Sequence, residues 1–112
     1  MGLNAADAQA MTFQQIVANR LSFRVAAAGS GEKLVLCLHG FPESAISWRH
    51  HIDPLAQAGY RVWAPDLRGY GGTTRPTGID AYRIESLMDD VTGLLDAAQV
   101  QRAILVGHDW GG

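Results

Sequence analysis

The chain has 112 residues, of which 47% are hydrophobic and 18% are charged, a composition typical of a single soluble globular domain. The formal net charge is −2 and the nine Lys and Arg are scattered, so we expect no nucleic-acid partner and no membrane partner. Residues 1–11 lack the basic start and the apolar stretch of a signal peptide, and no segment approaches a membrane span. We therefore expect a cytoplasmic protein.

Short apolar runs alternate with helical patterns along the chain, which is typical of a parallel sheet with helices on both faces. Alternating apolar and polar residues at 16–27 predict two short antiparallel strands, an edge hairpin that precedes a glycine turn at 29–31. Residues 33–39 (KLVLCLH) are almost continuously apolar, as expected of a central strand. The single cysteine, Cys37, lies in this run and is predicted to be a buried structural thiol.

Two helices are predicted after this strand. Ser47 is expected to cap the first, which ends near Gly59 and which Pro54 either confines or kinks. Its apolar residues are Trp48, Ile52 and Leu55. A strand at 60–64 and a Gly- and Pro-bearing loop at 65–80 follow. The second helix carries a stripe predicted to face the sheet, with its acidic residues mainly elsewhere. The stripe consists of Ile84, Leu87, Met88, Val91, Leu94, Leu95 and Ala98.

The last apolar run, at residues 103–106, leads directly into Gly107-x-Asp109-x-Gly111. This is the spacing of a nucleophile elbow, a sharp turn between strand and helix whose flanking positions must be small, here with Asp in the place usually held by Ser. HGFPES follows one predicted strand and DLRGYGG follows the next. Because parallel strands present their carboxyl ends at one edge of the sheet, all three motifs are expected to meet there.

These three motifs resemble the α/β-hydrolase superfamily, in particular its branch of epoxide hydrolases and haloalkane dehalogenases, from about Phe13 onward. The resemblance implies an α/β fold in which residues 1–112 form the N-terminal part of one doubly wound, mostly parallel domain, truncated at the nucleophile elbow. The lid and the C-terminal catalytic part, including the catalytic acid and histidine base, are expected to be absent from these residues. We therefore assign no base role to His39, His50, His51 or His108. His39 is expected instead to fix its loop through hydrogen bonds. DLRGYGG is expected to shape a loop beside the pocket.

An aspartate at the elbow indicates substitution at a saturated carbon. Attack by a serine would leave an ether that hydrolysis does not release, whereas attack by a carboxylate gives an ester that water can cleave. An aspartate is ionised at neutral pH without help from a base. We therefore predict that Asp109 is the catalytic nucleophile.

The resemblance also implies the remaining site residues. The backbone N–H groups of Phe41 and Trp110 match the family's oxyanion-hole positions, and His39, Phe41, Pro42 and Trp110 are expected to line the substrate pocket. No cofactor is predicted. No metal site is predicted either, because the adjacent side chains of His50 and His51 point about 100° apart on a helix, which is poor geometry for binding one metal ion. The expected partners are a small apolar epoxide-like or haloalkane-like substrate and water.

Two residues favour an epoxide hydrolase, which opens an epoxide to a diol through an Asp alkyl ester. Phe41 stands where haloalkane dehalogenases often carry a halide-binding Asn, and Trp110 stands where fluoroacetate dehalogenases usually carry Arg. A haloalkane or haloacid dehalogenase of the same fold remains the alternative. The second alternative is a truncated, non-catalytic fragment that pairs with another chain through its exposed sheet edge. Because the base is expected outside these residues, the 112-residue chain alone is expected to be inactive.

Overall fold

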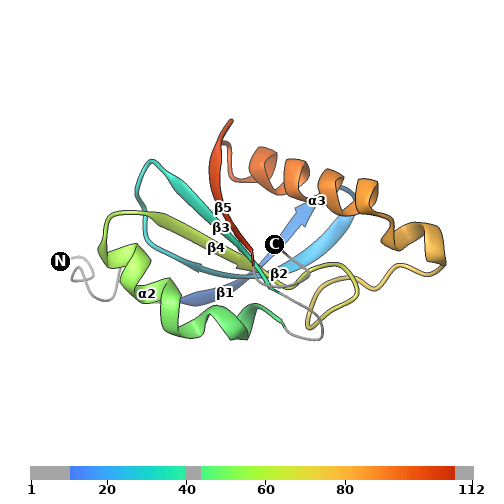
Figure 1. Ribbon diagram of the computed structural model, residues 1–112, viewed down its shortest axis with the longest axis horizontal. Coiled ribbons are helices and arrows are strands. Elements are labelled where there is room, and N and C mark those ends of the chain that lie inside the picture. Colours follow the sequence, from blue (N-terminus) through green and yellow to red (C-terminus); the bar gives the residue numbers. More distant parts are fainter. Residues whose placement is uncertain (1–10, 40–43, 108–112) are drawn as a thin grey trace.

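The computed structural model describes residues 11–39 and 44–107, which form one five-stranded sheet with helices on both faces (Figure 1). The strand order is β1-β2-β4-β3-β5. The strands are β1 (Thr12–Ala18), β2 (Leu21–Ala28), β3 (Leu34–Leu38), β4 (Arg61–Pro65) and β5 (Ala103–Gly107). The α/β class and the mostly parallel arrangement predicted from the sequence are therefore confirmed, since β4, β3 and β5 run parallel to one another.

The N-terminal hairpin is antiparallel, as predicted, and longer than the sequence pattern indicated. β1 pairs along its whole length with residues 21–27 of β2, and the two strands are joined at Asn19 and Arg20, which have φ values of 46° and 66°. Two consecutive residues with positive φ are typical of a two-residue turn that matches the twist of a hairpin. β2 also pairs antiparallel with β4, so β1 is an edge of the sheet.

The central strand, β3, is buried on both faces, as its apolar sequence predicted. Leu36 pairs with Trp63 of β4 on one side and with Leu105 of β5 on the other. The side chains of residues 34–37 are all buried, including the thiol of Cys37. Burial disfavours the charged thiolate and raises the pKa of Cys37 to about 11.

One face of the sheet is covered by η1 (Ala45–Trp48) and α2 (Arg49–Gln57). Their core contacts include Trp48 and Ile52, as predicted. The prediction that Ser47 caps this helix is wrong: its hydroxyl donates to the Ser44 carbonyl oxygen at 2.8 Å, and Trp48 occupies the N-cap position without a side-chain cap. The helix also continues through Pro54 to Gln57. Pro54 lies on the exposed side, where water can solvate the carbonyl that lacks a helical donor.

The other face is covered by α3 (Ile84–Ala97), which follows the short helix η2 (Ile79–Tyr82) (Figure 1). Leu94 is buried on the sheet as predicted, but the N-terminal half of the apolar stripe is not covered: Ile84 is 64% exposed and Met88 is 61% exposed. Asp90, which was expected away from the sheet, is buried. The reason is an ion pair with Arg68.

β5 forms the second edge of the sheet, and its side chains are less covered than those of β3. Ile104 and Leu105 are both exposed, although they belong to the apolar run that predicted the strand. Within residues 11–39 and 44–107, no helix has the length and apolar character needed to cross a bilayer.

Candidate active site

The carboxyl ends of the parallel strands bring two of the three sequence motifs to adjacent positions. Leu38, the last residue of β3, pairs with Gly107, the last residue of β5. His39 begins HGFPES immediately after Leu38, and Gly107 itself begins GHDWGG. The two motifs therefore start side by side at the edge of the sheet where open α/β folds place their ligands.

The side chain of His39 connects the first motif to the second. It is fully buried, and its Nε2 accepts a hydrogen bond from the Leu67 backbone N–H at 2.9 Å. Its ring also meets the ring of Tyr70 edge-on, with centroids 5.1 Å apart. Only an unprotonated ring nitrogen can accept this bond, so the structure requires the proton elsewhere on the imidazole. The expectation that His39 fixes a loop is confirmed, and its role in lining the pocket stays a prediction.

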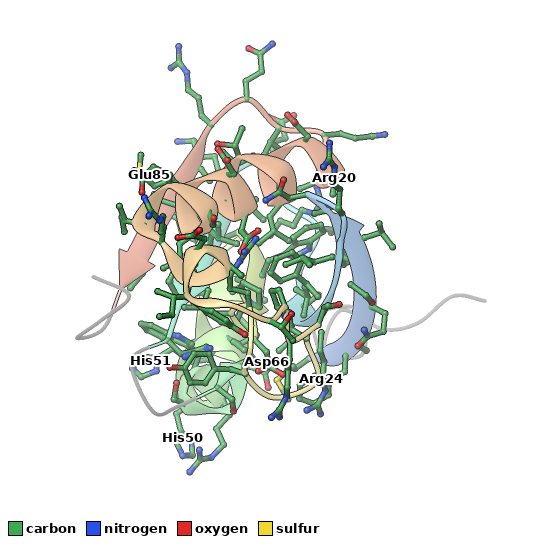
Figure 2. The ribbon with its side chains drawn as sticks, turned by 90° about the vertical axis from the view of Figure 1, so that its right-hand side faces the viewer. Arg20, Arg24, His50, His51, Asp66 and Glu85 are labelled. Atoms are coloured by element: carbon green, nitrogen blue, oxygen red, sulfur yellow. The ribbon has the colours of Figure 1, made fainter. Side chains whose placement is uncertain are left out.

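The carboxylate of Asp66, the first residue of the second motif, is buried and accepts hydrogen bonds from two other positions of the backbone. It is 1% exposed, its Oδ1 accepts from the Ala45 N–H at 2.7 Å, and its Oδ2 accepts from the Gly72 N–H at 2.9 Å. Arg24 of β2 lies beside the same carboxylate, with its Nη1 3.9 Å from Oδ2 (Figure 2). Two backbone donors and one cation thus compensate for the removal of this carboxylate from water.

The backbone at Gly71 explains why a glycine stands in this motif. Its φ is 51°, a conformation that glycine adopts without steric cost, and a Cβ there would lie 2.1 Å from the Asp66 Oδ2. The carboxylate therefore occupies the space in which any other side chain would begin.

Arg68 extends from the same loop to α3. Its Nε and Nη2 donate to the two carboxylate oxygens of Asp90 at 2.6 and 2.7 Å, and its Nη1 donates to the Ala81 carbonyl oxygen. The hydrogen bonds that Arg68 donates to Asp90 raise the pKa of its guanidinium. Asn19 completes the cluster by donating from Nδ2 to Asp90 at 2.8 Å. The sequence carried a signal for this site, because Asp90 falls three residues after Leu87 and four before Leu94 and so lies within the apolar stripe.

The predicted catalytic nucleophile, the predicted oxyanion donors and most of the expected pocket fall outside the described residues. Asp109, Trp110, Phe41 and Pro42 all lie there, so their assigned roles stay predictions. Within residues 11–39 and 44–107, no group of three or more His, Cys, Asp or Glu could hold a metal ion. His50 and His51 are exposed on α2 (Figure 2), and the ring of His51 packs edge-on against Trp48.

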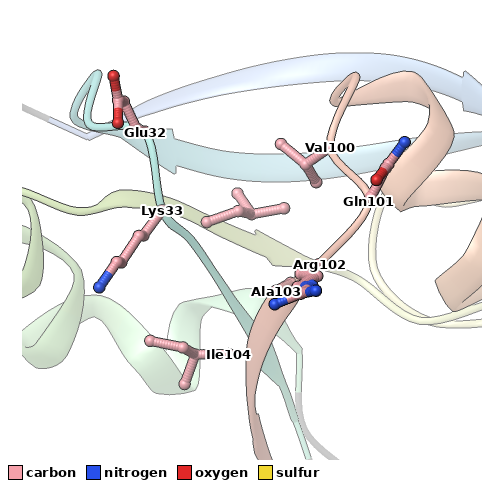
Figure 3. Close-up of a pocket in the computed structure, with 8 residues that line it drawn as sticks. Glu32, Lys33, Val100, Gln101, Arg102, Ala103 and Ile104 are labelled. Atoms are coloured by element: carbon pink, nitrogen blue, oxygen red, sulfur yellow. The ribbon is translucent and has the colours of Figure 1, made fainter.

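Two of the hollows in the described part of the molecule bear on the site. One, of about 700 Å³, lies between the amino ends of β3 and β5 and is bordered by Lys33 and Arg102 (Figure 3). It is at the opposite end of these strands from the three motifs, so we assign it no part in their chemistry. The other, of about 350 Å³, is lined by apolar side chains under the uncovered half of α3, including Leu38, Leu67 and Leu105.

Residues 33–112 match the family model of the α/β hydrolase fold. The chain belongs to this family. Epoxide hydrolase A of Mycobacterium tuberculosis is 52% identical over 103 residues, which cover 91% of this chain and 32% of that protein. The AB hydrolase superfamily protein YfhM of Bacillus subtilis is 49% identical over 100 residues, with coverages of 88% and 35%.

Solved α/β hydrolases share the same arrangement. The crystal structure of Epoxide Hydrolase A from Mycobacterium thermoresistibile matches with a TM-score of 0.88 and 47% identity, over 91% of this chain and 32% of that one. The epoxide hydrolase VrEH1 from Vigna radiata matches with a TM-score of 0.86 and 46% identity, over 90% and 32%. The chain thus spans about a third of the length of these relatives.

Proposed function

We propose that this chain supplies the nucleophile of an epoxide hydrolase, and that the nucleophile is Asp109. The similarity to proteins named epoxide hydrolase in two mycobacteria, extending over about nine-tenths of the chain, carries the proposal. The pairing of Leu38 with Gly107 supports it, because the segments proposed to hold Phe41 and Asp109 start from adjacent strand ends. The proposed substrate is a small apolar epoxide, with water as the second reactant.

The proposed reaction has two steps. In the first, a carboxylate oxygen of Asp109 attacks an epoxide carbon, the C–O bond breaks, and its electron pair goes to the epoxide oxygen, which takes a proton from an acidic donor. In the second, water attacks the carbonyl carbon of the resulting ester. The negative oxygen that develops accepts hydrogen bonds from the N–H groups of Phe41 and Trp110. Its collapse breaks the ester C–O bond, and the leaving oxygen takes back the proton that the base removed from water, which gives the diol. The acidic donor and the base that deprotonates water are expected outside these 112 residues.

A dehalogenase is the second candidate, because the same nucleophile and the same fold can displace a halide. The two departures at Phe41 and Trp110 favour the epoxide, since neither residue is the one usually found in the two dehalogenase types. Release of diol from epoxides without release of halide from haloalkanes or haloacids would support this choice. Release of halide without release of diol would identify a dehalogenase instead of an epoxide hydrolase, with Asp109 still the proposed nucleophile.

The decisive experiment is a single turnover in ¹⁸O-water, with the complete gene product in excess over a styrene oxide probe. The first diol is expected to be largely unlabelled, and the peptide containing Asp109 is expected to gain the heavy isotope, because water attacks the ester carbonyl. Asp109→Ala should abolish both the ester and turnover, whereas Asp96→Ala, an exposed carboxylate on α3, should leave both unchanged. Label in the first diol with none in the peptide would make Asp109 a general base and contradict the proposed mechanism.

A further inference from the structure

We propose that β1 is a dimerisation edge, at which a second copy of this protein adds its own β1 in antiparallel pairing. β1 is a terminal strand of the sheet (Figure 1), and among the described residues no strand pairs with its outer side. Pairing at β1 goes beyond the proposed function and is independent of it, because no residue of β1 is proposed to contact the substrate.

The backbone of β2 shows which groups of β1 face outward. Arg24 forms its backbone hydrogen bonds on the side of β2 away from β1: its N–H donates to the Thr73 hydroxyl at 3.0 Å, and its carbonyl oxygen accepts from the Asp66 N–H at 2.8 Å. Its partner in the hairpin, Gln15, therefore has no backbone bond to it. The hydrogen-bonding direction alternates along an antiparallel pair. The residues of β1 whose N–H and C=O groups point away from β2 are thus Phe13, Gln15 and Val17.

These outward groups fit a second set of the same groups. When two β1 strands run antiparallel with Gln15 opposite its own copy, Phe13 of each strand lies opposite Val17 of the other. Each outward N–H then meets an outward C=O, which gives about six hydrogen bonds around one twofold axis. A shift of the register by two residues leaves one of these three residues without a partner within β1. The pairing centred on Gln15 therefore satisfies the most backbone groups.

The side chains of this edge also suit a second copy. Val17 is 76% exposed and Phe13 is 41% exposed, although both side chains are large and apolar. The pairing centred on Gln15 places each Phe13 beside a Val17, and aromatic and β-branched side chains that lie directly opposite each other stabilise antiparallel strands. The dimer thus covers apolar surface that a monomer leaves in water.

β1 lacks the features with which proteins usually protect an edge strand. Exposed edges commonly carry a lysine or another charge, a proline, or a bulge, and each of these hinders the pairing of a further strand. The sequence of β1, TFQQIVA, has no charged residue and no proline, and its register with β2 is one-to-one from Thr12 to Ala18. Two copies can therefore meet without like charges facing each other, and the self-complementary pattern favours a second copy over an unrelated strand.

The first test measures the self-association of the complete gene product by sedimentation velocity over a series of concentrations. The wild type is expected to form a dimer. Gln15→Lys places two ammonium groups on Cα atoms about 5.5 Å apart and should raise the dissociation constant at least about tenfold. Thr12→Lys is the matched control, because it adds the same charge at an exposed position of β1. The two copies of residue 12 would be about 20 Å apart, so the dissociation constant should rise less than about threefold.

A mixture of two variants separates pairing at β1 from a general loss of structure. Gln15→Glu should weaken the dimer as Gln15→Lys does, because two carboxylates then face each other across the axis. In an equimolar mixture of the two variant proteins, a lysine faces a glutamate, and a heterodimer should form with a dissociation constant within about threefold of the wild-type value. A mixture that associates no better than either folded variant alone would overturn the proposed interface.

A cysteine at the axis tests the register directly. In Gln15→Cys the two thiols lie on Cα atoms about 5.5 Å apart, a separation that a disulfide can span, whereas in Thr12→Cys the corresponding atoms are about 20 Å apart. Mild oxidation should link Gln15→Cys into a covalent dimer and leave Thr12→Cys unlinked, and the buried Cys37 does not compete.

Three results would each overturn the proposed dimer. They are a wild type that stays monomeric at every concentration, a dimer that keeps its affinity in Gln15→Lys, and oxidation that links Gln15→Cys no faster than Thr12→Cys. If the charged variants do not fold, the comparison of the two cysteine variants decides alone.

Discussion

Arg68 and Asp90 form a bidentate ion pair whose side chains are only 7% and 3% exposed, with N···O distances of 2.6 and 2.7 Å. The pair joins the loop after β4 to the middle of α3. Because Asn19 donates to the same carboxylate, the hairpin turn is joined to them as well. Three segments that are far apart in the sequence are therefore connected by hydrogen bonds to the carboxylate of Asp90.

Removal of that carboxylate should be strongly destabilising. Asp90→Ala leaves the Arg68 guanidinium buried without its counter-charge, and we expect the free energy of unfolding to fall by about 3–5 kcal/mol. Urea denaturation of the complete gene product measures this change. The neighbouring Asp89 is exposed, so Asp89→Ala should change stability by less than about 0.5 kcal/mol. Equal effects of the two substitutions would mean that the buried pair contributes nothing beyond an exposed charge.

A pair of glycine substitutions separates backbone strain from steric overlap. Gly71 and Gly78 both have positive φ, but a Cβ at Gly71 would lie 2.1 Å from the Asp66 carboxylate, whereas a Cβ at Gly78 would meet nothing within 4 Å. Gly78→Ala should therefore cost only the backbone term, about 1–3 kcal/mol, because its φ of 93° and ψ of 151° lie in a region that essentially only glycine adopts. Gly71→Ala should cost at least about 1 kcal/mol more by thermal unfolding. A smaller cost at Gly71 than at Gly78 would contradict the close packing of the Asp66 carboxylate.

Ionisation of Cys37 should make stability depend on alkaline pH. Burial raises the pKa of this thiol from its ordinary value of 9.0 to about 11, so the unfolded chain loses the proton at lower pH than the folded chain does. The stabilisation is fully present below pH 9 and is lost as pH rises toward 11. The difference in free energy of unfolding between the wild type and Cys37→Ala should fall across this window.

The same burial predicts slow chemical labelling. At pH 8 a thiol reagent should modify Cys37 slowly in the folded protein and quickly after denaturation, since both thiolate fraction and access are low in the fold. Rapid labelling under native conditions would contradict the burial of β3.

Replacement of one residue at the end of α3 should stabilise the protein. Gln99 has a φ of 62° immediately after the helix, and the following Val100 N–H donates back to the Leu95 carbonyl oxygen at 3.1 Å. Glycine is preferred in this left-handed capping position, so Gln99→Gly should raise the free energy of unfolding by about 0.5–1 kcal/mol. Gln101→Gly, two residues later and without positive φ, should lower it by a similar amount through the entropy of the unfolded chain.

A polypeptide limited to these 112 residues should show no repeated turnover of epoxides. Asp109 could be alkylated once, but the base proposed to release the ester is expected outside this sequence. Multiple turnovers by purified, contaminant-free protein would contradict both the assigned base position and the inactive-fragment expectation.

Periodicity in the sequence was sufficient to predict most of the fold. The hairpin and the buried β3 follow from the local spacing of apolar residues, and both were confirmed. The helix α3 was also confirmed, but the start of its apolar stripe is exposed at Ile84 and Met88 instead of facing the sheet. Local spacing failed where a distant partner decided the outcome. Asp90 is buried because Arg68 lies opposite it, and Ser47 bonds within a 3₁₀ turn instead of capping the helix that begins at Arg49.

The candidate site likewise contains features that the local sequence predicted and features that depend on residues distant in the sequence. The sequence predicted that His39 would fix a loop and that DLRGYGG would shape one, and both expectations were confirmed. The bond between Asp66 and Ala45 spans 21 residues and has no local signature, so only the fold reveals it. The roles of Asp109, Phe41, Pro42 and Trp110 stay predictions, carried by their motifs.

The position of β5 has a consequence for how the chain folds as it leaves the ribosome. β2, β4 and β3 can pair with one another once Pro65 has emerged, but β3 finds its second neighbour only after α3 and the whole of β5 have been synthesised. During that interval an apolar strand with an open row of N–H and C=O groups is available to other chains. Nascent molecules stalled between α3 and β5 are thus the form of this protein that a chaperone would need to protect.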